Sequence, residues 1–105
     1  MVQLIPVADT QPPTWRLAGE LNIHHAAQAR QTLLDALNGW QGELLRVDLA
    51  DVTETDTAGV QLLLALQRSL RERGAQLEVA ACPDVVSHVS RALGLEWPAQ
   101  AGGQR

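Results

Sequence analysis

The sequence contains no lysine, tyrosine or phenylalanine, and its single cysteine is Cys82. One thiol excludes an intramolecular disulfide and a zinc cluster built on cysteines. The eight basic residues are all arginines, and twelve acidic residues give a net charge of −4. Because the arginines are not clustered, the basic surface of a nucleic-acid-binding protein is missing, and we expect no nucleic-acid partner.

Long hydrophobic runs are also absent. The longest dense one, residues 62–66, is far too short to span a bilayer, and the first residues lack the charged region of a signal peptide. We therefore expect a cytoplasmic protein without direct membrane insertion. The 105 residues, of which 46% are hydrophobic, suffice for one domain with a real core but leave little room for a deep substrate cleft.

Alternating and helix-forming segments predict the element order β-β-α-β-α-β-α. We expect strands at residues 2–7, 14–18, 44–49 and 76–81, and helices at residues 26–37, 57–73 and 83–93. Gly19 is expected to end the second strand, and residues 50–56 to form an acidic loop. The later strands alternate apolar and charged residues, which predicts a sheet with one face covered by helices and the other partly wet. Residues 1–97 form the predicted domain, and residues 98–105 a flexible C-terminal tail.

The acidic stretch before the second helix is the richest segment for chemistry. Its four carboxylates lie within nine residues, at Asp48, Asp51, Glu54 and Asp56. A phospho-accepting aspartate of the receiver type needs a lysine, which this chain lacks. Magnesium or calcium would require alternating oxygen ligands in a glycine-containing loop, which residues 51–56 do not supply. A solvated loop with helix-capping side chains is the simpler interpretation.

Thr57 is the residue that we single out. Either Asp56 or Thr57 can cap the following helix, and the free N–H groups of its first turn favour a negative charge. A hydroxyl exposed at such a junction is a suitable phosphoacceptor, and a phosphate would add about −1.5 to −2 units of charge. The fold would tolerate this charge, whereas a surface shaped to meet a partner would not. A simple N-cap role for Thr57 remains the alternative.

The other candidate sites are weak. His24 and His25 are adjacent and would point about 100° apart on a helix, so together with His88 they make a poor zinc site. Cys82 is interpreted as a small core residue. No serine lies in a nucleophile-elbow sequence, and the glycines form no phosphate-binding motif. We therefore expect no cofactor, no metal and no enzymatic activity.

One long segment resembles a known family. Residues 45–60, LRVDLADVTETDTAGV, followed by QLLLAL, are similar to the signature of STAS domains, named for sulfate transporters and anti-sigma factor antagonists. Supporting pieces are LAGEL at residues 17–21 and RGAQL at residues 73–77, and the similarity covers roughly residues 3–95. The resemblance implies an α/β fold: a single STAS-like domain with a four- to five-stranded mixed sheet and helices packed mainly on one face.

The resemblance also implies a function. In the anti-sigma factor antagonists of this family, the hydroxyl matching Thr57 is phosphorylated by a kinase that is also the anti-sigma factor, and only the unphosphorylated form captures that kinase. Thr57 is then the phosphoacceptor of a non-enzymatic, partner-switching module whose protein partner is kinase-like. The implied partner-binding residues are Asp51, Glu54, Asp56, Ala58 and Gly59.

Two positions differ from the best-known antagonists. They usually have serine where this chain has Thr57, and many have a second serine where it has Ala58. Threonine followed by Ala-Gly also occurs in the STAS subunits of phospholipid-trafficking ABC transporters, where the domain braces the ATPase subunit. A third group, similar at residues 19–24, accompanies chemotaxis-type signalling proteins. A transporter subunit and a chemotaxis-associated adaptor are therefore the alternatives.

Overall fold

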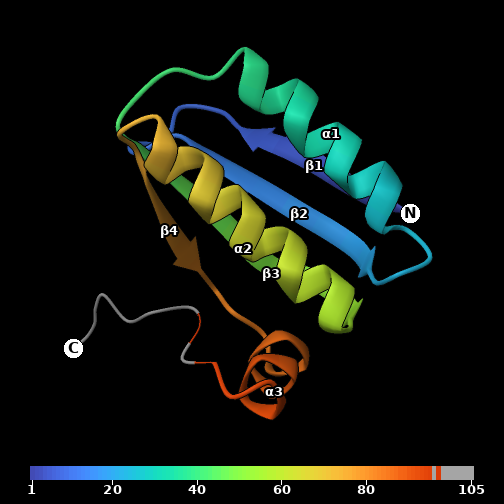
Figure 1. Cartoon of the computed structure of the whole chain (residues 1–105). Coiled ribbons are helices and arrows are strands. Elements are labelled where there is room, and N and C mark those ends of the chain that lie inside the picture. The colour runs from blue at the N-terminus through green and yellow to red at the C-terminus, as the bar shows by residue number, and fades with distance from the viewer. Residues whose placement is uncertain (96, 98–105) are drawn as a thin grey trace.

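The computed structural model describes residues 1–95 and 97. Across these residues the chain forms one four-stranded mixed sheet and three helices (Figure 1). The elements are β1 (Val2–Val7), β2 (Thr14–Leu21), α1 (Ala26–Asn38), β3 (Leu44–Thr55), α2 (Thr57–Glu72), β4 (Gln76–Ala80) and α3 (Asp84–Ala92). The predicted α/β class and element order are confirmed. The predicted tail, residues 98–105, lies outside the described residues.

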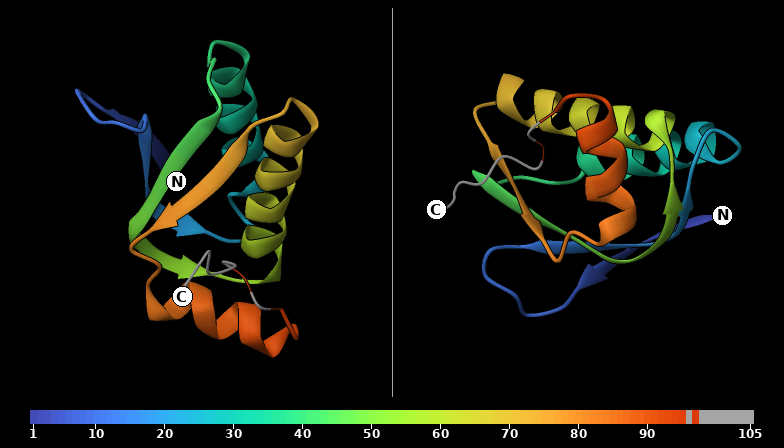
Figure 2. Two further views of the ribbon diagram at one scale, coloured as in Figure 1. Left: turned by 90° about the vertical axis from the view of Figure 1, so that its left-hand side faces the viewer. Right: turned by 90° about the horizontal axis from the view of Figure 1, so that it is seen from below.

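The strands follow the chain order β1-β2-β3-β4 across the sheet. β1 runs antiparallel to β2, whereas β2, β3 and β4 are parallel to one another. α1 and α2 are therefore the two crossover connections, and both step across the sheet in the same direction. Right-handed crossovers then place both helices on the same face, where they lie side by side (Figures 1 and 2).

The core lies between this sheet face and the two helices. Trp15, Leu45 and Val47 are buried on the strands, and Leu33 and Leu63 are buried on α1 and α2. The alternate strand residues face the open side of the sheet, as predicted. There Arg16 Nε lies 3.9 Å from Asp48 Oδ2, and Arg46 Nε lies 3.3 Å from Glu78 Oε1. Because these pairs are partly exposed, each contributes at most about 1 kcal/mol.

The C-terminal part of the described chain closes one end of the molecule. α3 packs against the second half of β3 rather than over the face that α1 and α2 cover (Figure 2). Val86 of α3 is completely buried. Trp97 is 7% exposed and belongs to the core, and its Nε1 donates a hydrogen bond of 3.2 Å to Gln67 Oε1 on α2.

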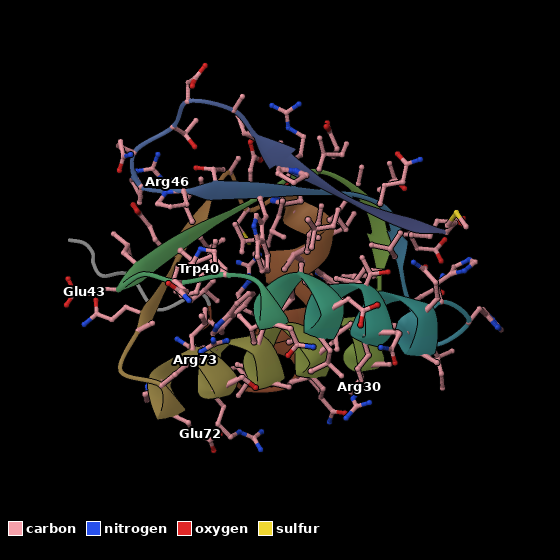
Figure 3. The ribbon with its side chains drawn as sticks, turned by 90° about the horizontal axis from the view of Figure 1, so that it is seen from above. Arg30, Trp40, Glu43, Arg46, Glu72 and Arg73 are labelled. Carbon is pink, nitrogen blue, oxygen red and sulfur yellow. The ribbon has the colours of Figure 1, made fainter. Side chains whose placement is uncertain are left out.

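At the C-terminal end of α2, Arg73 connects α2 to the end of α1. The Arg73 guanidinium donates hydrogen bonds to the carbonyl oxygens of Leu37 (3.1 Å) and Trp40 (3.3 Å). Figure 3 shows Arg73 and Trp40 together at this end of the molecule. The last carbonyls of a helix lack intrahelical donors and carry a partial negative charge. The Arg73 cation, just after α2, therefore stabilises the end of α1.

Two predicted boundaries were wrong. β2 continues past Gly19 to Leu21, and β3 continues through the segment predicted as an acidic loop. Register shifts in the β2–β3 pairing break the alternation of buried residues, so that Leu49 is followed by Val52 on the buried side. A bulge of this kind hides a continuous strand from periodicity, and the φ of +110° at Gly19 suits glycine at the irregular position.

None of the helices in residues 1–95 and 97 has the length and apolar character needed to cross a bilayer.

Candidate functional site

Asp56 connects the start of α2 to the loop between β2 and α1. It occupies the N-cap position, and its Oδ1 accepts a hydrogen bond of 3.1 Å from the Gly59 N–H. The other carboxylate oxygen, Oδ2, accepts one of 2.9 Å from the Ile23 N–H. The sequence left Asp56 and Thr57 as alternative caps, and in the structure Asp56 is the cap.

Thr57, the first residue of α2, is left free by this arrangement. Its side chain is exposed, and its hydroxyl makes no hydrogen bond within the part of the chain that the structure describes. The first N–H groups of a helix have no intrahelical acceptor and carry a partial positive charge. Thr57 therefore presents an unengaged hydroxyl at the positive end of a helix.

The first turn of α2 lies directly on the end of β2. The Thr55 hydroxyl donates a hydrogen bond of 2.7 Å to the Leu21 carbonyl oxygen. A Cβ added at Gly59 would overlap both this carbonyl oxygen and the Thr55 hydroxyl. Gly59 is buried, so within this junction it serves close packing and offers no side chain to a partner.

Hydrogen bonds hold the β2–α1 loop beside this junction. Asn22 is only 6% exposed, its Nδ2 donates to Glu54 Oε1, and its Oδ1 accepts a hydrogen bond of 3.1 Å from the His24 N–H. The His25 N–H donates to the Asn22 carbonyl oxygen at 3.0 Å. Ile23, between them, is 68% exposed. A hydrogen-bonded loop therefore presents a large apolar side chain next to Asp56.

Sequence reasoning missed both Asn22 and Ile23. An isoleucine flanked by Asn22 and His24, outside any strand or helix periodicity, was the signal available for an exposed apolar residue. Its position next to Asp56 depends on a contact between residues 33 apart in the chain.

The predicted partner-binding residues are only partly brought together. Glu54, Asp56 and Ala58 surround Thr57 at the end of β3 and the start of α2. Asp51 lies five residues before Asp56 in an extended strand, which separates them by roughly 16 Å. Its Oδ2 is 3.9 Å from Arg16 Nε on the open side of the sheet.

Nucleophilic and metal-binding groups do not gather in the described part of the chain. Burial, with a smaller effect of the Asp84 carboxylate, raises the pKa of the Cys82 thiol. This thiol therefore stays protonated at neutral pH and is a poor nucleophile. Residues 1–95 and 97 contain no group of three or more His, Cys, Asp or Glu side chains placed to hold a metal ion.

Comparison with known families decides the identity of this fold. Residues 7–97 match the family described as "Mlab, STAS domain". The chain belongs to the STAS-domain family. The resemblance of residues 45–60 to the STAS signature is thereby confirmed. A comparison with curated proteins finds no significant match.

Solved structures share the STAS fold. An anti-sigma factor antagonist from Mycobacterium paratuberculosis has a TM-score of 0.73 and 17% identity, with coverage of 91% of this chain and 80% of that chain. SpoIIAA in its unphosphorylated form has a TM-score of 0.69 and 21% identity, with coverage of 98% and 88%. A serine-to-glutamate variant of Moorella thermoacetica RsbS has a TM-score of 0.66 and 20% identity, with coverage of 99% and 86%.

A different kind of protein also contains a similar region. For the protein called Mglu, the TM-score is 0.60 and the identity 21%, and the match covers 77% of this chain but only 20% of Mglu. This STAS domain therefore spans about a fifth of that chain. At these identities the structural likenesses show the fold, and the function is argued from the site.

Proposed function

We propose that this STAS domain is a regulatory module that docks onto a partner protein through the start of α2, and that phosphorylation of Thr57 controls the docking. The observation that carries the proposal is the difference in hydrogen bonding between Asp56 and Thr57 at the start of α2. Asp56 caps the helix with both carboxylate oxygens engaged, while the exposed Thr57 hydroxyl makes no hydrogen bond within the described residues. Thr57 can therefore be modified without breaking a structural contact.

The modification is a phosphoryl transfer from ATP. The Thr57 Oγ1 bonds to the γ-phosphorus, the bond to the leaving ADP breaks, and the hydroxyl proton passes to a base of the kinase. The phosphate would add about −1.5 to −2 units of charge beside Glu54 and Asp56. The positive end of α2 favours this anion, so the fold tolerates it. A partner surface shaped for a neutral hydroxyl would instead meet a large, strongly hydrated group.

The proposed partner is a kinase-like anti-sigma factor. The fold of SpoIIAA, a protein named as an anti-sigma factor antagonist, supports this choice. A transporter ATPase subunit is the second candidate, because the sequence Thr57-Ala58-Gly59 matches that of transporter-associated STAS subunits. In addition, the description of the matching family, "Mlab, STAS domain", does not mention anti-sigma factor antagonists. In that second case Thr57 would act as a direct contact and not as a switch.

The test uses the protein that co-purifies with this domain from its native host, purified separately and titrated by calorimetry. Thr57→Glu should weaken binding at least about tenfold, which corresponds to about 1.4 kcal/mol. Thr57→Ala removes the hydroxyl without adding charge and should still bind. Circular dichroism should show both variants folded. If Thr57→Glu binds like the wild type while Thr57→Ala loses binding, the switch is refuted and the transporter-subunit function is favoured.

A further inference from the structure

A depression lies next to the Thr57 junction, between the end of β3 and α3. It is lined by Thr53, Glu54, Thr55, Asp84, Val85, His88 and Val89. Figure 2 shows α3 running beside the end of β3, on the side of the molecule away from α1. Thr55, which lines the depression, is only two residues from Thr57, so the depression lies beside the proposed docking position.

The depression combines an apolar lining with carboxylates. Val85 is 38% exposed, and Val89 extends the apolar surface along α3. Glu54 and Asp84 line it from β3 and α3 respectively. Glu54 accepts one hydrogen bond, from Asn22, and Asp84 forms no ion pair with another described residue.

None of the arginines among the described residues lines this depression. Arg16 lies close to Asp48 and Asp51, and Arg46 pairs with Glu78, all on the open side of the sheet. The carboxylates of the depression are therefore not neutralised by these arginines. The described residues offer no three-ligand metal site, so a divalent cation is not the matching occupant.

The chemistry that matches an apolar lining with carboxylates is a long cationic side chain. Arginine buries its methylene stem on apolar surface while its guanidinium remains at a polar edge. The guanidinium forms charge-assisted hydrogen bonds with carboxylates that are shorter and stronger than neutral ones. The two valines suit the stem of this side chain, and the Glu54 and Asp84 carboxylates suit its guanidinium; the other lining residues are Thr53, Thr55 and His88. A purely apolar side chain would cover the Asp84 carboxylate without giving it a partner.

We propose that this depression receives an arginine side chain from the partner protein, as the second half of the docking surface that begins at Thr57. The inference rests on the proposed function only in that a protein docks at this end of the molecule. The inference adds a description of the partner surface. That surface is basic where it meets α3 and lacks strong negative charge there.

The experiment uses a peptide probe, so it does not depend on identifying the partner. The peptide acetyl-Leu-Arg-Leu-amide is titrated into the labelled domain and followed by nitrogen–proton correlation spectra. Its control is the same peptide with citrulline, which has nearly the same shape without the charge. The arginine peptide should saturably shift the amide signals of Glu54, Thr55 and residues 84–89. The citrulline peptide should bind about fivefold more weakly, equivalent to roughly 1 kcal/mol of ion pairing.

Substitutions of the two carboxylates test whether they contribute to the affinity for the arginine peptide. Glu54→Gln and Asp84→Asn should each reduce the affinity for the arginine peptide severalfold. Glu72→Gln is the matched control, because Glu72 is an exposed carboxylate at the other end of α2 (Figure 3). Equal binding of the two peptides, shifts confined to other surfaces, or no shifts at all would overturn the proposal. So would a dimer of the domain alone that Asp84→Asn dissociates in sedimentation, because the occupant would then be a second copy.

Failure of this inference can be told apart from failure of the proposed function. Thr57→Ala should leave the affinity for the peptide unchanged, since its hydroxyl does not line the depression. If the arginine peptide binds as expected but Thr57→Glu has no effect on the natural partner, the arginine site stands and the phosphorylation switch fails. The opposite pair of results leaves the switch standing and removes the arginine site.

Discussion

Neighbouring residues at the start of α2 have different tasks. Asp56 uses its side chain to hold the helix and the β2–α1 loop, whereas the hydroxyl of Thr57 makes no hydrogen bond to any residue in 1–95 or 97. Gly59 has no side chain because the end of β2 occupies the space. Within one helical turn, structural roles thus alternate with an exposed position, and this separation allows Thr57 to change chemically while the fold stays intact.

Replacing Gly59 by alanine should destabilise the domain. The new Cβ would overlap the Leu21 carbonyl oxygen and the Thr55 hydroxyl, so α2 must move away from β2. We expect a loss of about 1–3 kcal/mol in the free energy of unfolding, measured by urea denaturation. Gly39→Ala is the matched control, because a Cβ there meets nothing within 4 Å. Equal stability of the two variants would contradict close packing at Gly59.

The exposed side chain of Ile23 lies beside the proposed docking surface, because the Ile23 N–H bonds to Asp56, and we expect it to contact the partner. Ile23→Ser should weaken binding of the natural partner at least about tenfold, or about 1.4 kcal/mol, while the melting temperature changes little. Leu34→Ser is the control, because Leu34 is also exposed, at 37%, but lies on α1. Calorimetric titration that shows the same loss for both variants would assign the effect to general surface hydrophobicity.

At the scale of the elements, α2 joins the core to the site. Its first turn carries Thr57, and its buried stripe packs against the sheet, with Leu63 only 1% exposed. The orientation of the proposed docking surface therefore depends on the packing of the whole helix. Arg73, just beyond α2, extends this role by bonding to the end of α1.

A charge in the buried stripe should unfold the domain. Leu63→Asp places an unpaired carboxylate against the sheet, and the cost of several kcal/mol is comparable to the whole stability of a small domain. We expect loss of the cooperative thermal transition in circular dichroism. Gln61→Asp, an exposed substitution on the same helix, should melt close to the wild type. A wild-type melting curve for Leu63→Asp would show that the core lies elsewhere.

At the scale of the whole molecule, residues after α3 return to the core. Trp97 packs with the buried cluster and bonds to Gln67 of α2. Trp97→Ala should lower the free energy of unfolding by about 3–5 kcal/mol, the usual cost of removing a buried tryptophan. Gln67→Ala, which removes only the hydrogen-bond acceptor, should cost about 1 kcal/mol. Urea denaturation checks both, and a loss for Trp97→Ala no larger than for Gln67→Ala would contradict core packing at Trp97.

Features that depend on near neighbours in the chain could be predicted from the sequence. Alternation at Leu45 and Val47 predicted the sheet with one covered face, and the Asp56-Thr57 junction was recognisable as a helix start. Element order followed from such local patterns, whereas the family was indicated by the resemblance of residues 45–60 to the STAS signature. These predictions succeeded because periodicity and capping are encoded within one or two turns of chain.

Features that depend on contacts between distant residues could not be predicted and emerge only in the folded chain. The bulge in the β2–β3 pairing converts the predicted acidic loop into strand and carries Asp51 away from Thr57. The hydrogen bond from Ile23 to Asp56 and the depression between β3 and α3 join segments about thirty residues apart. No local pattern encodes them, because strand register and helix packing are set by the balance of burial and hydrogen bonding over the whole fold.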